Sequence, residues 1–185
     1  MRFGSFKPLF ALTALVLLLS ACAGGSPIQH HEGKTVYTQI TIWADGNQHL
    51  ATNYRVGYQI PVNTRVEILD SNRDAIVINV PDINRNVRIV NVPGYTNLDI
   101  EGIYDRYFSD SRVNLNRFDA ATREAIEKGE PKEGMSRDAV VMARGYPPAH
   151  QTPSLDQNTW TYWRNRFARQ VVTFSGDSVS ELEGF

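Results

Sequence analysis

Apolar and polar residues alternate in the segment 35–92 with the period of two that β-strands require. Its first residues, TVYTQITIW, place Val36, Ile40 and Ile42 on one face of a predicted strand at 35–43. Asp45-Gly46 follows with the composition of a hairpin turn. The pattern therefore predicts a strand that turns back sharply.

Four more strands are expected at 50–54, 65–69, 75–80 and 87–92. Prolines fall between the apolar runs, where a missing amide hydrogen does not interrupt a hydrogen-bond ladder. Short strands at such close spacing predict a small antiparallel sheet or a partly closed barrel over 35–97.

The period becomes helical at 98–108, within a predicted connector at 98–118. A clearer helix is expected at 119–128, where Asp119 can cap the first turn and Gly129 can end the last.

A further short helix begins after Ser136, which has the position of an N-cap, and ends at Gly145 and Pro147. Gly145 is expected to be left-handed. Strongly β-prone runs follow at 159–163, 167–174 and 178–182. The region 119–185 is therefore predicted to contain two helices and a three-stranded antiparallel sheet, and the fold class of the whole chain to be α+β.

The N-terminus has the pattern of an export signal. Arg2 and Lys7 form a short basic region before the apolar run PLFALTALVLLL. This run is too short to span a bilayer, which needs about 20 residues. We therefore expect a signal peptide at 1–21.

Leu19-Ser20-Ala21-Cys22 resembles the lipobox of bacterial lipoproteins. The resemblance implies a diacylglyceryl group on the Cys22 thiol and an acylated amine, and so a membrane anchor of several acyl chains. Cys22 is the only cysteine, so the lipidated form leaves no free thiol in an oxidising periplasm and no intrachain disulfide. The alternative is an ordinary secreted protein cleaved after Ala21 or Ala23.

Residues 22–34 are small and polar, and they predict a flexible tether in which His30 and His31 are solvated. Ala23 follows the cysteine in place of the aspartate that retains enterobacterial-type lipoproteins at the inner membrane. The resemblance therefore implies a protein of the outer membrane that faces the periplasm.

Gly134-Met135-Ser136, Gly145-Tyr146-Pro147 and Trp160-Thr161-Tyr162 resemble the SmpA/OmlA (BamE-like) lipoprotein domain, and residues 171–179 are similar to its last hairpin. The match covers about 120–183. It implies two helices packed on a three-stranded sheet, and a role in envelope assembly, since the best-known member belongs to the outer-membrane β-barrel assembly machine. The long β-rich region before the motif departs from the small members of that family.

Residues 53–68 are similar, more weakly, to bacterial Src-homology-3-like repeats, with an Ile60-Pro61 pair, Thr64 and the strand after it. Any β-hairpin with a polar turn is the alternative. The resemblance implies a surface that binds cell wall or peptide.

Composition and charge exclude several classes of function. The chain is 42% hydrophobic and 21% charged with a net charge of −1, which gives a real core but no basic footprint for nucleic acid. The sequence has no spacing typical of a metal site, a phosphate loop or a nucleophile elbow, and His49 and His150 are isolated. We expect no enzyme, no catalytic residues, no cofactor and no metal.

The aromatic run at 159–163 is the main candidate interaction site. Alternation places Trp160 and Tyr162 in the core and Trp163 on the outer face. The candidate partner-binding residues are Trp163, Arg164, Arg166, Phe167 and Arg169. Aromatic residues mixed with arginine are enriched in interfaces, although a solvated hairpin and an anionic-lipid site are alternatives.

The sequence thus predicts an outer-membrane lipoprotein that acts as a scaffold in the assembly or maintenance of the cell envelope, through contacts with envelope proteins. Two alternatives stay open. One is a peptidoglycan-binding module that uses the β-rich region, and the other is an inhibitor-like periplasmic protein, which rests on fold analogy alone.

Overall fold

The computed structural model describes Met1, residues 31–52 and residues 54–185. The segment 2–30, with the predicted lipidation site Cys22 and with His30, lies outside the described residues. The described strands are β1 (Thr35–Thr38), β2 (Ile42–Ala44), β3 (Gln48–Leu50), β4 (Tyr58–Ile60), β5 (Arg65–Ser71), β6 (Ala75–Val80), β7 (Arg85–Val90), β8 (Phe108–Ser109), β9 (Thr159–Asn165), β10 (Ala168–Ser175) and β11 (Ser178–Glu183). The α-helices are α1 (Pro93–Thr96), α2 (Ile100–Tyr107), α3 (Ala120–Lys128) and α4 (Arg137–Arg144).

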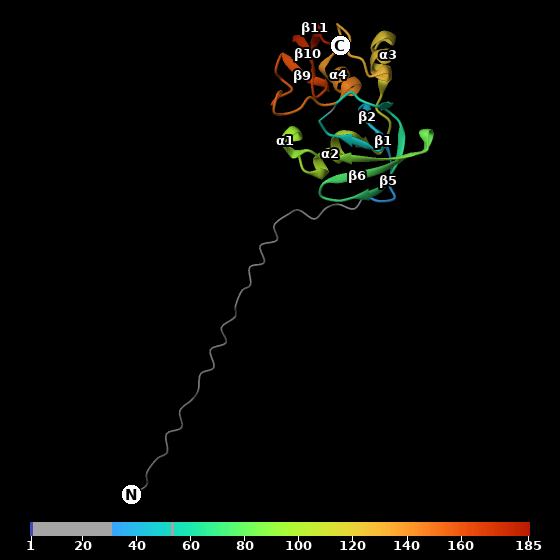
Figure 1. Ribbon diagram of the computed structural model, residues 1–185, viewed down its shortest axis with the longest axis vertical. Coiled ribbons are helices and arrows are strands. Elements are labelled where there is room, and N and C mark those ends of the chain that lie inside the picture. The colour runs from blue at the N-terminus through green and yellow to red at the C-terminus, as the bar shows by residue number, and fades with distance from the viewer. Residues whose placement is uncertain (2–30, 53) are drawn as a thin grey trace.

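The fold class is α+β, as the sequence predicts, with a larger sheet in the N-terminal half and a smaller one in the C-terminal half (Figure 1). The larger sheet has the order β3-β7-β6-β5-β1-β8, β2 and β4 form a separate pair, and the smaller sheet has the order β11-β10-β9. Strands β3 and β7 run parallel, so the N-terminal sheet is not purely antiparallel.

The predicted strand at 35–43 is broken into β1 and β2. Between them the backbone turns to other partners: Gln39 N–H donates to Tyr107 O at 2.8 Å, and Thr41 N–H donates to Met142 O at 2.9 Å. The apolar alternation continues across the break, because Val36, Ile40 and Ile42 are all buried. The pattern therefore gives the buried face correctly but not the end of the strand.

The Asp45-Gly46 turn forms as predicted, with two backbone hydrogen bonds between Asp45 and Gln48 at 2.9 and 3.1 Å. The two strands that it joins then enter different sheets, and the predicted strand at 50–54 is wrong. The strand there is β3, which ends at Leu50: Ala51 N–H still donates to Val90 O at 2.9 Å, and the chain turns at Ala51 and Thr52.

Helices α2, α3 and α4 follow their local signals, whereas the short helix α1 is not predicted from the sequence and has no side-chain cap. Asp99, Asp119 and Ser136 cap α2, α3 and α4 through side-chain oxygens that accept from backbone N–H groups at 2.9, 2.8 and 3.3 Å. Gly145 ends α4 with φ +81 and ψ −175, so φ is positive but ψ is extended, in contrast to the left-handed conformation expected. None of the helices in the described part of the chain has the length and hydropathy to cross a bilayer.

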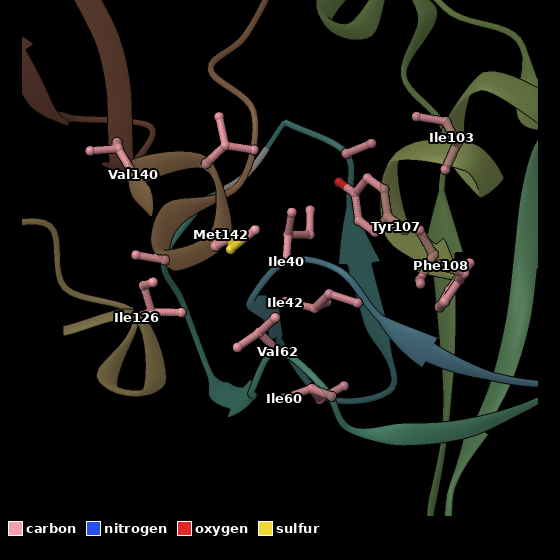
Figure 2. Close-up of a cluster of buried hydrophobic side chains, with 14 of the residues drawn as sticks. Ile40, Ile42, Ile60, Val62, Ile103, Tyr107, Phe108, Ile126, Val140 and Met142 are labelled. Atoms are coloured by element: carbon pink, nitrogen blue, oxygen red, sulfur yellow. The ribbon is translucent and has the colours of Figure 1, made fainter. Parts of the chain in front are cut away.

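One hydrophobic core joins the two halves of the chain (Figure 2). Ile40 and Ile42 meet Ile126 of α3 and Met142 of α4, and Tyr107 of α2 lies on the other side of Ile40. Strand β8, from the predicted connector at 98–118, also pairs with β1 in the larger sheet. The predicted regions 35–97 and 119–185 therefore do not have separate cores.

Candidate interaction surfaces

The predicted partner-binding residues lie together on the β9–β10 hairpin. In its register Trp163 pairs with Arg169 and Asn165 pairs with Ala168. At the tip, the Asn165 side-chain oxygen accepts from the backbone N–H groups of Phe167 and Ala168 at 2.9 and 3.0 Å. This Asx turn presents Phe167, whose side chain is 79% exposed.

Three arginines lie on the same hairpin, and one of them contacts the exposed ring. The Arg166 guanidinium lies 4.6 Å from the centre of the Phe167 ring, in cation–π range. Arg164 donates to Gly184 O at 3.3 Å, and Arg169 lies 3.8 Å from the Glu183 carboxylate in an exposed pair. Exposed pairs of this kind contribute little to stability, so Arg169 can exchange that partner for another anion.

The base of the hairpin is anchored in the core. Trp160 and Tyr162 are fully buried, as predicted, and the Tyr162 hydroxyl donates to Gly145 O at 2.9 Å. Trp163 lies on the opposite face and is half-buried. Alternation alone therefore identifies which aromatic residues belong to the core.

Arg144, which the sequence does not single out, binds the base of the hairpin through hydrogen bonds to β9 and β10. Its guanidinium is almost fully buried and donates to Trp163 O at 2.9 Å and to the Gln170 side chain at 3.2 Å. Burial lowers the pKa of Arg144 to about 10, so the side chain stays charged at neutral pH. The sequence signal for Arg144 is a cation in the last turn of a helix, which normally indicates only an interaction with the helix dipole.

A second concave surface lies in the N-terminal half. It is a groove of about 200 Å³ lined by Trp43, Asp45, Gln48, Leu50, Tyr54 and Val56. Arg55 covers the Trp43 ring at 4.9 Å and pairs with Glu130 at 2.7 Å, so the indole is held from both halves of the chain. Sequence reasoning missed this groove because its residues come from a turn and a loop as well as from strands.

His31 is not solvated, which corrects the prediction of a flexible tether up to residue 34. Its side chain is buried, its ring stacks on Tyr104, and Nε2 donates to Glu101 at 2.8 Å. Nδ1 accepts from Lys34 at 3.1 Å. The chain is therefore fixed to α2 from His31 onward.

His49 is buried, and both of its ring nitrogens make hydrogen bonds within the core. Its Nδ1 donates to Trp43 O at 2.7 Å, and its Nε2 accepts from the Tyr107 hydroxyl at 3.0 Å. Burial lowers the pKa of His49 to about 4 and raises that of Tyr107, so both side chains are neutral at physiological pH. Across the described residues, no group of three or more His, Cys, Asp or Glu side chains is placed to hold a metal ion.

Comparison with known proteins adds no relative to these observations. The chain matches no family model, no curated protein and no solved structure.

Proposed function

We propose that the protein is an outer-membrane lipoprotein, anchored through Cys22 and facing the periplasm, that acts as a non-enzymatic scaffold in envelope assembly or maintenance. The observation that carries this proposal is the hairpin tip, where Phe167 is 79% exposed beside Arg166. An exposed aromatic ring beside an arginine has the composition of a binding surface, in which both residue types are enriched.

The hairpin suits a partner with an acidic and apolar patch. Burying an exposed aromatic ring contributes roughly 1.5–3 kcal/mol, and arginines at the rim speed encounter with an acidic surface. The buried anchor at Arg144 and Tyr162 keeps the hairpin base ordered before binding. Such pre-organisation lowers the entropy that association costs.

Photocrosslinking in cells tests this surface. A photoreactive phenylalanine analogue at position 167 is expected to give one defined adduct with an envelope protein, and Arg166→Ala is expected to reduce its yield. The matched control places the same analogue at Leu69, which is 41% exposed on β5. The same adducts at both positions, or none at 167, would refute the hairpin as the binding surface.

The anchor is tested separately. Acyl chains contribute about 0.8 kcal/mol per buried CH₂, so two or three chains hold the protein at the membrane. Cys22→Ser is expected to remove the fatty-acid mass and to release the protein from sedimented outer membranes. A parent protein without fatty acid would exclude a lipoprotein.

The groove at Trp43 favours a second candidate function, binding of the cell wall by the N-terminal half. Its aromatic and polar lining is typical of a small-ligand site. Full-length protein is expected to co-sediment with purified peptidoglycan, and a protein that stays in the supernatant would exclude this function.

A further inference from the structure

We propose that the groove between β2, β3 and the loop before β4 binds a sugar ring of a glycan. This inference extends the second candidate function, because the cell wall is one source of such a ring, but it does not depend on the lipid anchor. It rests on the size of the groove, on its aromatic walls and on the polar side chains at its rim.

The walls of the groove match the apolar faces of a pyranose. Trp43 and Tyr54 supply aromatic surface, while Leu50 and Val56 supply aliphatic surface. Leu50 is 39% exposed, so its side chain is accessible to a ligand in the groove. A sugar ring carries its C–H groups on its two faces, so it can lie against an aromatic ring without losing hydrogen bonds.

The polar side chains of the groove are available to a ligand. Asp45, Gln48 and Tyr54 line it, and none of the three makes a side-chain hydrogen bond to another described residue. A carboxylate accepts hydrogen bonds, whereas an amide and a phenol both donate and accept them. Sugar hydroxyls, which also donate and accept, are chemically matched to all three groups.

The groove also disfavours other ligand classes. At about 200 Å³ it is smaller than a drug-sized site, which takes roughly 300–1,000 Å³. Asp45 is the charged residue of its lining, and the nearby Arg55 is already paired with Glu130, so phosphates and other anions are disfavoured. A purely apolar ligand would leave Asp45 and Gln48 desolvated without partners.

Trp43 is positioned before any ligand arrives. The guanidinium of Arg55 lies over its ring at 4.9 Å, and Glu130 holds Arg55 at 2.7 Å. His49 bonds to the backbone oxygen of Trp43 at 2.7 Å. These contacts fix the indole as a stable wall of the groove, which reduces the cost of ordering it on binding.

Calorimetric titration of purified full-length protein tests the proposal. The probes are soluble N-acetylglucosamine oligomers, which represent the cell wall, and neutral O-antigen oligosaccharides released from lipopolysaccharide, which represent a second source of sugar rings. Saturable binding of either probe is expected, with affinity at least 10-fold weaker in Tyr54→Ala and in Asp45→Asn. Phe167→Ala, on the hairpin, is the matched control and is expected to bind like the parent.

The outcomes separate the groove from the second candidate function. Binding of the lipopolysaccharide sugars without co-sedimentation with peptidoglycan supports the groove and rejects the cell wall as its ligand. Co-sedimentation that is unchanged in Tyr54→Ala and Asp45→Asn overturns the groove, and so does the absence of heat with both probes. Circular dichroism of both variants checks that any loss is not due to unfolding.

Discussion

The imidazole of His31 stacks on the phenol ring of Tyr104, with ring centres 3.6 Å apart and planes 6° from parallel. Glu101, one turn earlier on α2, accepts a hydrogen bond from the same imidazole at 2.8 Å. His31 therefore joins the start of the segment 31–52 to helix α2.

Replacing His31 by alanine is expected to lower the free energy of unfolding by about 1–3 kcal/mol, because an aromatic pair and a hydrogen bond to a carboxylate are both lost. Urea denaturation followed by circular dichroism measures the change. His31→Phe keeps a ring on Tyr104 but loses Glu101, so an intermediate loss is expected. A stability equal to the parent in His31→Ala would show that the stacking is incidental.

Stability is expected to fall as the pH is lowered from 6.5 toward 4, because of His49. Burial lowers its pKa from 6.5 to about 4. Between these pH values His49 is protonated in the unfolded chain but neutral in the folded chain, so acid favours unfolding. The loss approaches roughly 3 kcal/mol at pH 4 and levels off below it.

The measurement is the free energy of unfolding at several pH values for the parent and for His49→Gln. Subtracting the two curves removes the contributions of other titrating groups, which both proteins share. The difference is expected to change between pH 4 and 6.5 and to be flat near pH 8. A flat difference throughout would mean that folding does not shift the pKa of His49.

Local signals in the sequence predict α2, α3, α4 and the C-terminal sheet well, but not α1. Helix α4 begins after Ser136 and ends before Gly145. Each of these caps bonds to a residue only three or four positions away in the chain, so the signal can be seen in the local sequence. Strands β9, β10 and β11 are likewise close to their predicted positions, since each pairs with its neighbour in the chain.

The features that the sequence could not predict depend on contacts between residues far apart in the chain. The break after Thr38 depends on Tyr107 and Met142, whose carbonyl oxygens come from distant helices. The hairpin residues form a candidate site visible in the sequence because one turn holds them together. The groove at Trp43 and Tyr54 is not visible there, because a turn and a loop bring its walls together.

Gly57 is expected to be intolerant of any side chain. Its φ is +80, and a Cβ atom there would lie 1.9 Å from the carbonyl oxygen of Ala44. Gly46 is the matched control, because its φ is +57 but the space around it is open. Gly46→Ala is expected to cost about 1 kcal/mol of backbone strain, whereas Gly57→Ala costs at least about 3 kcal/mol, because β2 and β4 must separate.

Thermal unfolding of the two variants distinguishes these costs. Equal shifts in Tm would show that the loop before β4 moves away from Ala44 without loss. A larger shift for Gly57→Ala, together with a weaker affinity for the sugar probes, would also connect the groove to the position of this loop.

The shared core predicts that the two halves unfold together. Ile126 of α3 is fully buried in the cluster that also contains Ile40, Ile42 and Met142, so Ile126→Ala weakens a core shared by both halves. It is expected to cost roughly 2–5 kcal/mol. Leu69→Ala, at an exposed position of β5, is the control and is expected to change stability by less than about 0.5 kcal/mol.

Two spectroscopic signals test whether the halves unfold together. In Trp43→Phe the remaining tryptophans, Trp160 and Trp163, report on the C-terminal half, while far-ultraviolet circular dichroism reports on the whole chain. Ile126→Ala is expected to move both signals to the same lower urea midpoint in this background, because neither half keeps a complete core without the other. Two separated transitions, with the fluorescence midpoint alone shifted, would show instead that the N-terminal sheet is stable by itself.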